Sequence, residues 1–313
     1  MNRRNLAFLV PYNPRELFAV VDHKPAAKRA LAAAGIPVPA TYAELALQWD
    51  LRRLREILAP HPDFVIKPAR GAGGGGVQVV VGRSDGQFAK ASGARLALAD
   101  LAAHCADILA GAYSLGQRSD QVMIESRVAT DPVLGDVSYQ GLPDVRVLVF
   151  RGVPIQAMIR LPTRASDGRA NLHMGGVAVG VDLARGITVH GWHGGRAATV
   201  HPDLGRSVIG IVVPAWDRIL AIAARCFEAV PLGYLGVDVV VDAKVGPMVL
   251  ELNARPGLTI QLANRAGVRR VMEEIVRCDP GRLTLEERVS LGQELALSAG
   301  GGRSGCCASS SPP

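Results

Sequence analysis

Short apolar runs rich in valine, isoleucine and leucine alternate along this chain with stretches of helical periodicity. A short β-branched run bounded by glycine, proline or polar residues predicts a strand, whereas apolar residues three and four apart predict an amphipathic helix. Because the two patterns alternate, the sequence predicts a mixed α/β fold.

The first half of the chain is predicted to hold helices around one hairpin. A helix is expected at residues 24–34, because Gly35 is suited to end it. Thr41 and Glu44 form a capping box, which predicts a second helix that continues to Leu58. The remaining elements are a strand ending at Lys67, a strand at 77–81, a helix at 96–110 and a strand at 122–125.

Paired strands and polar loops dominate the second half of the predicted fold. Arg151 and Gly152 separate two β-branched runs and predict a hairpin there. Thr284 and Glu287 form another capping box, which predicts a last helix to about Leu297. The remaining elements are polar loops at 129–143 and 164–176, hairpin strands at 145–150 and 153–161, a helix at 214–230, and paired strands at 237–241 and 248–252.

Composition narrows the class of protein. The 313 residues suffice for one large domain or two ordinary ones, and the 49% hydrophobic content supports a substantial core. The net charge of +7 suits an acidic partner such as a nucleotide, a glutamate-type substrate or an anionic membrane surface. Basic residues are scattered without a lysine or arginine block, which argues against specific nucleic-acid binding.

The cysteines and the apolar stretches indicate a protein of the reducing cytoplasm. Five cysteines occur without metal-ligand spacing or a disulfide framework. No secretory signal is recognisable in residues 1–21, and Pro214 and Asp217 interrupt the longest apolar stretch, so no membrane span is expected. Residues 299–313 are rich in glycine, serine and cysteine, and we expect this tail to be disordered.

A glycine-rich loop directly after Lys67, in the run FVIKPARGAGGGGVQVVV, is the first candidate for chemistry. Gly71, Gly73 and Gly76 match G-x-G-x-x-G, but a dinucleotide-binding loop opens a helix, and residues 77–81 predict a strand instead. No G-K-[ST] follows, which excludes a P-loop. A glycine loop between strands is able to fold over phosphates, and the alternative is a flexible hairpin tip. The glycines placed for this role are Gly73, Gly74 and Gly75.

Three oxygen-bearing side chains on the last predicted strand pair form the second candidate. Glu251 and Asn253 lie two apart on one strand and therefore share a face, while Asp238 lies on the preceding strand. Magnesium prefers such oxygen ligands, completed by substrate phosphates. A polar sheet edge is the alternative, but an unpaired carboxylate directly after Val249 and Leu250 would be costly to bury. We therefore expect a magnesium site.

Further polar groups surround these two motifs. Arg255 follows the expected metal ligands, and its planar fork suits phosphate or carboxylate, although it also fits a surface turn. The run RANLHMGG offers Arg169 and Asn171 either as a phosphate loop or as an ordinary polar loop. His190 and His193 are an alternative metal pair, but the glycines around them predict a loop.

These motifs, taken in order, resemble the ATP-grasp superfamily. The strongest parts are DVRVLVFRGVPIQAMIR, RANLHMGG and LGVDVVVD…GPMVLELNARPG, and the likeness spans roughly residues 20–275. More closely, the chain resembles glutamate ligases that modify a protein's terminal carboxylate, and the α-L-glutamate ligase-like group. The resemblance implies an α/β ATP-grasp domain at 21–298, whose smaller subdomain (about 40–125) and larger subdomain (about 126–298) clasp ATP. A short lead at residues 1–20 stands where the family has an N-terminal domain.

The resemblance also assigns roles to individual residues. Lys67 matches a lysine on the α- and β-phosphates, and Lys24 matches the upstream lysine of a D-K motif. Glu125 and Ser126 match the hinge that holds adenine and ribose. The other matches are Asp144 as an ATP contact, Arg169 and Asn171 near the γ-phosphate, and Asp238, Glu251 and Asn253 as magnesium ligands.

The expected function is that of an ATP-dependent carboxylate–amine ligase that uses ATP with Mg²⁺, or with Mn²⁺ in its place. A carboxylate of a small molecule or peptide would attack the γ-phosphorus, and an amine such as glutamate would convert the acylphosphate into an amide. Arg169, or Arg160 on a neighbouring strand, would stabilise the transferring phosphoryl group. Arg255 would hold the carboxylate beside the 129–143 loop.

Two other functions remain open from the sequence, namely a non-catalytic ATP-binding regulatory module and a kinase that stops at phosphoryl transfer. The short lead at residues 1–20 motivates the first, a module that would regulate a partner through ATP-dependent closure. A partner protein that supplies the missing N-terminal domain and a homo-oligomer are further expectations.

Overall fold

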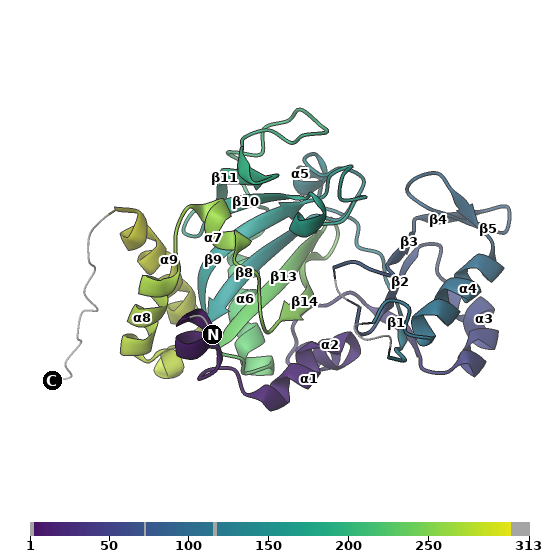
Figure 1. The fold of residues 1–313 in the computed structure, drawn as a ribbon, viewed down its shortest axis with the longest axis horizontal. Helices are drawn as coiled ribbons and strands as arrows, with labels where there is room; N and C mark the ends of the chain where they lie inside the picture. Colours follow the sequence, from purple (N-terminus) through teal and green to yellow (C-terminus); the bar gives the residue numbers. More distant parts are fainter. Residues whose placement is uncertain (1–2, 72, 115–117, 302–313) are drawn as a thin grey trace.

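Two lobes make up the structure, a computed structural model that describes residues 3–71, 73–114 and 118–301. In Figure 1 the larger lobe surrounds a broad sheet, and the smaller lobe stands beside it. The helices α1 (Phe18–Val21) and α2 (Lys24–Ala33) lie below and between the two. In the described part of the chain, no helix is both long and apolar enough to cross a membrane.

The larger lobe is built on a seven-stranded sheet in the order β12-β11-β10-β9-β8-β13-β14, and every neighbouring pair is antiparallel. Its central strands carry apolar residues, mainly valine, isoleucine and leucine, on both faces, because both faces of the sheet are covered. The strands are β8 (Asp144–Phe150), β9 (Val153–Leu161), β10 (Val177–Asp182), β11 (Ile187–His193), β12 (Arg196–Ala198), β13 (Tyr234–Asp242) and β14 (Gly246–Asn253).

The two faces of this sheet pack against different elements. One face, which includes Val147 and Val237, forms the main core with α6 and α2. The opposite face, which includes Leu148 and Met158, packs against α7, α8 and the N-terminal segment. The helical elements of this lobe are α5 (Pro132–Gly135), η4 (Leu172–Met174), α6 (Trp216–Ala229), α7 (Thr259–Asn264), α8 (Arg269–Cys278), η5 (Pro280–Arg282) and α9 (Leu285–Gly301).

The smaller lobe carries a four-stranded antiparallel sheet in the order β1-β7-β2-β3 and a three-stranded sheet in the order β4-β5-β6. Phe64 and Ile66 of β2 are buried with Leu101 of α4, so this lobe has its own core. The elements are β1 (Thr41–Leu45), η3 (Gln48–Arg53), α3 (Leu54–Leu58), β2 (Phe64–Pro68), β3 (Gln78–Val80), β4 (Gly82–Ser84), β5 (Gln87–Ala89), β6 (Arg95–Leu96), α4 (Leu98–Leu109) and β7 (Val122–Glu125).

The N-terminal segment, with η1 (Asn5–Leu9) and η2 (Arg15–Leu17), is part of the larger lobe's packing. Phe8 and Leu9 are buried, and the Phe8 ring meets the Phe150 ring edge-on at 5.8 Å between centroids. Asn13 is buried and donates to the carbonyls of Tyr234 (2.8 Å) and Ala254 (3.1 Å), and its Oδ1 accepts from the Tyr234 N–H at 2.7 Å. The short lead therefore contributes side chains to the core of the larger lobe.

Most of the expected elements are present, including α2, the β8–β9 hairpin, β7, α6 and the β13–β14 pair. The capping box of the last helix is confirmed, because Thr284 N donates to Glu287 Oε2 at 2.8 Å and Glu287 N donates to Thr284 Oγ1 at 3.2 Å. That helix extends to Gly301, beyond the expected end near Leu297. The prediction of a disordered tail falls largely on residues 302–313, which lie outside the described residues.

The helix predicted from Thr41 to Leu58 is wrong in its first part. Residues Thr41–Leu45 form strand β1, which pairs with β7, and Glu44 accepts from Arg29 instead of capping a helix. Asp50 provides the local turn contact, because its Oδ2 accepts from the Ala46 and Leu47 N–H groups at 3.0 and 2.9 Å. Pairing with a distant strand has therefore overridden the local capping signal.

The loop predicted around His190 and His193 is also wrong. Both histidines lie on strand β11, and a spacing of three on a strand directs their side chains to opposite faces. They do not pair on one metal ion. The expected polar loop at 129–143 is interrupted by the short helix α5, which Asp131 caps by accepting from the Val133 N–H at 2.9 Å.

Candidate functional site

A row of charged and polar side chains crosses the larger sheet on the face opposite the main core. In the antiparallel register, Asp238 on β13 lies between Arg146 on β8 and Glu251 on β14, and Asp144 on β8 lies opposite Arg160 on β9. Residues two apart on a strand share a face, so the two sets lie side by side. Strand register thus assembles a site from four neighbouring strands.

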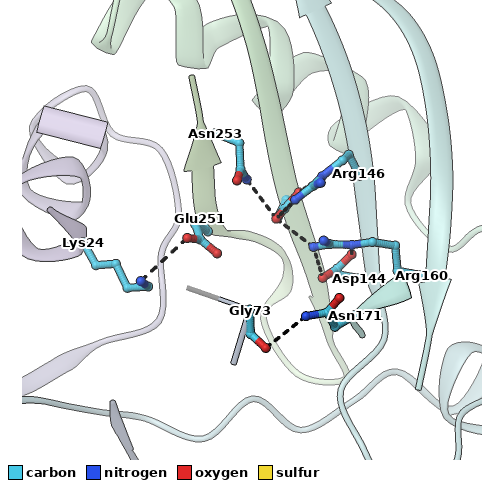
Figure 2. Close-up of polar contacts among 9 residues, drawn as sticks. Lys24, Gly73, Asp144, Arg146, Arg160, Asn171, Glu251 and Asn253 are labelled. Atoms are coloured by element: carbon cyan, nitrogen blue, oxygen red, sulfur yellow. Dashed lines mark hydrogen bonds and ion pairs between the residues drawn. The ribbon is translucent and has the colours of Figure 1, made fainter. Parts of the chain in front are cut away.

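Paired guanidinium–carboxylate contacts hold the centre of this row, as Figure 2 shows. Arg146 donates through Nε and Nη2 to the two oxygens of Asp238, each at 2.6 Å. Arg160 donates in the same two-pronged way to Asp144 at 2.6 and 2.5 Å, and its Nη2 also contacts Asp238 Oδ2 at 2.7 Å. Such forks fix both the distance and the orientation of a carboxylate.

Burial and the two arginines set the charge states in this row. Burial raises the pKa of Asp144 to about 6, and Arg160 offsets only part of that effect. Burial acts on Asp238 in the same direction, but Arg146 and Arg160 outweigh it and hold the pKa of Asp238 at about 2. The Asp238 carboxylate therefore stays ionised at neutral pH.

The three expected magnesium ligands lie together on this face. Asn253 Nδ2 donates to Asp238 Oδ2 at 3.1 Å, and Glu251 is Asp238's register partner. Glu251 and Asn253 fit a magnesium ion, because they present a half-exposed carboxylate and an amide oxygen. Asp238 is less available as a metal ligand, because its Oδ2 already accepts from three donors. Its Oδ1 accepts from Arg146, the single described donor to that atom. Among the described residues, no cluster of three histidine, cysteine or acidic side chains that could hold a metal ion is found.

The glycine loop of the smaller lobe reaches across to the larger lobe. The Gly73 carbonyl accepts from Asn171 Nδ2 at 3.1 Å, a contact visible in Figure 2. A Cβ on Gly74 would lie 3.1 Å from Arg169 Cδ, so the two chains are already in close approach there. Gly73 and Gly74 have φ of +64° and +80°, values that glycine adopts without strain, and Gly75 lies between them and β3. The structure therefore brings together four residues that the sequence had placed in two motifs.

Lys24 bridges the same two parts from α2. Its Nζ donates to the Gly71 carbonyl and lies 3.7 Å from Glu251 Oε1. One ammonium group therefore contacts both the base of the glycine loop and an expected metal ligand. Its position suits contact with an anion held between them.

Glu125 is buried between two lysines. Lys67 Nζ lies 2.5 Å from Glu125 Oε1, and Lys28 Nζ donates to Glu125 Oε2 and, at 3.0 Å, to the Pro39 carbonyl. Burial alone would raise the pKa of Glu125, but Lys67 and Lys28 outweigh it and lower that pKa. Sequence reasoning missed Lys28, although its spacing of four from Lys24 on one helix was an available signal.

Ser126 and Arg255, the two remaining expected site residues, make contacts within the protein. Ser126 pairs in both directions with Ala40: its Oγ accepts from the Ala40 N–H at 3.0 Å, and its own N–H donates to the Ala40 carbonyl at 2.8 Å. Arg255 is exposed, and its guanidinium lies over the Phe18 ring at 4.7 Å from the centroid. In this arrangement both side chains have local partners.

A cavity of about 90 Å³ adjoins the row at Arg146 and Arg160. Its charged wall is formed by Arg146 and Arg160, and its other residues come from β9, η4 and the segment after β14. The lining residues include Met158, Asn171, Leu172, His173 and Thr259. Arg255 does not line it. The cavity combines anion-binding groups with a small apolar wall.

The fold and the site together define the class of protein. A glycine hairpin on one lobe that closes toward a polar row on the antiparallel sheet of another lobe is the arrangement of ATP-grasp proteins. The chain matches the family described as sugar-transfer associated ATP-grasp over residues 3–277, and it therefore belongs to that family. The superfamily resemblance is confirmed, whereas the closer likeness to glutamate ligases stays a prediction. A comparison with curated proteins found no match.

Several solved structures are similar to this chain at low sequence identity. The ATP-grasp ligase PsnB complexed with a minimal precursor is 18% identical, with a TM-score of 0.46 over 85% of this chain and 63% of PsnB. The D-cycloserine synthetase DcsG is 20% identical, with a TM-score of 0.47 over 92% of this chain and 73% of DcsG. D-alanine–D-alanine ligase from Bacillus anthracis complexed with ATP is 16% identical, with a TM-score of 0.43 over 90% and 67%. The chain thus spans less than two thirds of the length of PsnB.

Proposed function

We propose that this protein is an ATP-dependent carboxylate–amine ligase. The observation that carries the proposal is the convergence of two sets of groups on one place. The glycine loop and Lys67 come from the smaller lobe, while Glu251, Asn253 and Asp238 come from the larger sheet. Asn171 and Lys24 connect the two sets directly. Groups suited to phosphates and groups suited to a divalent ion therefore face each other.

The nucleotide would be bound mainly from the smaller lobe. Lys67 and the backbone N–H groups of Gly73, Gly74 and Gly75 would bind phosphate oxygens, and Arg169, which lies beside the loop, would contact the γ-phosphate. Glu251 and Asn253, with the open side of Asp238 Oδ1, would hold Mg²⁺, which supplies charge neutralisation on the phosphates when bound. Mn²⁺ would satisfy the same oxygen donors.

The chemistry proceeds in two displacement steps. A carboxylate oxygen of the acceptor attacks the γ-phosphorus, and the bond from that phosphorus to the β,γ-bridging oxygen breaks. ADP departs, and the acceptor becomes an acylphosphate. The nitrogen of the amine, for which glutamate is our candidate, then attacks the acyl carbon, and phosphate leaves as the nitrogen loses a proton. The protein contributes position and fixed positive charge, chiefly through Arg160 and Arg169.

We place the acceptor carboxylate in the 90 Å³ cavity rather than beside Arg255. Arg146 and Arg160 each use Nε and Nη2 for aspartates, so the Nη1 group of each guanidinium is the donor left for an incoming anion among the described contacts. The cavity of about 90 Å³ has room for several water molecules, and therefore for the acid end group of an acceptor.

The decisive experiment needs no knowledge of the amine. Protein, ATP and Mg²⁺ are incubated with amino acids or carboxylated peptides in the presence of hydroxylamine, which converts an acylphosphate into a hydroxamate. Hydroxamate with equimolar ADP supports the ligase, and mass spectrometry without hydroxylamine then identifies the amide. Arg146→Lys should slow hydroxamate formation strongly, and Arg255→Ala should leave it nearly unchanged. If Arg255→Ala instead slows hydroxamate formation strongly and Arg146→Lys leaves it nearly unchanged, the acceptor carboxylate binds beside Arg255.

A non-catalytic ATP-binding module is the second candidate, because one observation favours it. Asp238 is engaged by Arg146, Arg160 and Asn253, an arrangement that competes with a metal ion. Saturable ATP binding with no ADP release for any acid would support this module. A phosphorylated product without amide would support a kinase.

A further inference from the structure

Lys28 is a buried cation that the proposed reaction does not use. It extends from α2 into the smaller lobe, where its Nζ contacts the Pro39 carbonyl and Glu125 Oε2. Lys67 occupies the other oxygen of the same carboxylate, at 2.5 Å from Oε1. Lys28, Lys67 and Glu125 are 5%, 5% and 2% exposed, so water reaches none of them freely.

The charges around Lys28 do not balance. Two ammonium groups share the single carboxylate of Glu125, which leaves one positive charge in excess. The other charged groups that line the crevice beside Lys28 are Lys24, on its own helix, and Glu251 of β14, and these two pair at 3.7 Å. A buried net charge is costly unless it loses its proton or gains a counter-ion.

We propose that Lys28 is a proton-coupled positioning residue of the nucleotide site, which becomes fully protonated when the phosphates of a nucleoside triphosphate bind beside Lys67. The inference rests on the proposed function, because Lys67 must be the phosphate ligand. Lys28 reaches the nucleotide through Glu125 and Lys67 and not by direct contact. Its proton comes from solvent, so each binding event at mildly alkaline pH removes a fraction of a proton from the buffer.

The physical basis is the electrostatic environment of Lys28. Burial first, and repulsion from Lys67 second, lower the pKa of Lys28 from its ordinary value of 10.5 to about 8, against the attraction of Glu125. A phosphate beside Lys67 offsets that repulsion and brings the counter-ion that the cluster lacks, so the pKa of Lys28 rises. Near pH 8 about half of the Lys28 side chains are neutral, and binding should therefore take up about half a proton per nucleotide.

Isothermal titration calorimetry in two buffers tests this linkage. MgADP or a non-hydrolysable MgATP analogue is titrated at pH 8 in HEPES and in Tris, which differ in ionisation enthalpy. The expected result is a buffer-dependent binding enthalpy that corresponds to uptake of about half a proton and that declines toward pH 6.5.

Two variants separate proton coupling from positioning. Lys28→Met should lose the uptake and bind MgATP about tenfold more weakly, the effect of losing one hydrogen bond to a charged group. Lys28→Arg keeps a permanent positive charge beside Glu125, so it should retain most of the affinity while losing the uptake. Thermal melts of both variants establish that they are folded.

The outcomes distinguish this inference from the function on which it rests. Nucleotide binding with the same enthalpy in both buffers at pH 8 would overturn the role of Lys28 and leave the proposed ligase intact. Uptake that persists in Lys28→Met would place the proton on another group and also overturn it. Absence of nucleotide binding to the wild-type protein would overturn both proposals together.

Discussion

Asn13 offers the sharpest test of how the N-terminal segment supports the site. Its side chain is buried and makes three hydrogen bonds to the backbone of Tyr234, where β13 begins, and of Ala254, directly after β14. Ala254 follows Asn253, a proposed metal ligand. The substitution Asn13→Ala removes all three bonds without disturbing a charge.

The magnitude follows from those contacts. A neutral hydrogen bond contributes about 1 kcal/mol net, and a buried N–H left without a partner costs about 1–3 kcal/mol. Asn13→Ala loses two donated bonds and leaves the Tyr234 N–H buried without its acceptor. We therefore expect the free energy of unfolding to fall by about 3–5 kcal/mol, a large part of the roughly 5–15 kcal/mol typical of a domain.

Urea unfolding followed by far-ultraviolet circular dichroism measures this loss. Glu16→Ala is the matched control, because Glu16 lies three residues away in the same segment and is exposed. Asn13→Asp gives a second check, because at neutral pH its carboxylate would face two carbonyl oxygens and should be at least as destabilising as alanine. If Asn13→Ala unfolds within about 0.5 kcal/mol of Glu16→Ala, the N-terminal segment is only an attached lead and the reasoning fails.

Four further predictions concern the site. Glu251→Gln should abolish most ADP release while the melting temperature stays unchanged, because it removes carboxylate charge proposed for Mg²⁺; full activity would refute the metal assignment. Lys67→Ala should weaken ATP binding more than AMP binding in parallel titrations, and equal losses would indicate a structural role. Gly74→Ala should raise the KM for ATP about tenfold, because φ is +80° and the new Cβ would lie 3.1 Å from Arg169 Cδ; an unchanged KM would show that the loop is not closed in this way. Because folding lowers the pKa of Lys28 to about 8, its charge penalises the folded state below pH 8 and ceases to do so as pH rises to 10.5. The stability of Lys28→Met relative to wild type should therefore fall by about 3 kcal/mol over that range, and urea unfolding at both ends checks the sign.

Elements whose formation depends on neighbouring residues could be predicted from the sequence. The β8–β9 hairpin was predictable because β-branched runs flank Arg151 and Gly152, and α2 because Gly35 follows it. The capping box at Thr41 was no less regular, yet β1 formed there through pairing with β7 about eighty residues away. The sequence alone does not show whether such a segment forms a capped helix or pairs with a distant strand.

The site shows the same division. The residue types and spacing of Asp238, Glu251 and Asn253 indicated that they share a region, and the register places them together. The pairing of Asp238 with Arg146 was not predictable, because it depends on β8 and β13 being neighbours in the sheet. Lys28 was missed for a related reason, since its importance arises only when Glu125 has a second lysine on its other oxygen.

The row of charges across β9, β8, β13 and β14 has a consequence for folding. A slip of one residue in any of these strands would turn its side chains to the opposite face of the sheet. Asp238 would then enter the valine-rich core without Arg146, and an unpaired buried carboxylate costs several kcal/mol. Misregistered sheets should therefore be strongly disfavoured, so the ion pairs select the native strand register during folding. A sheet that forms in the native register therefore also brings the residues of the candidate site together.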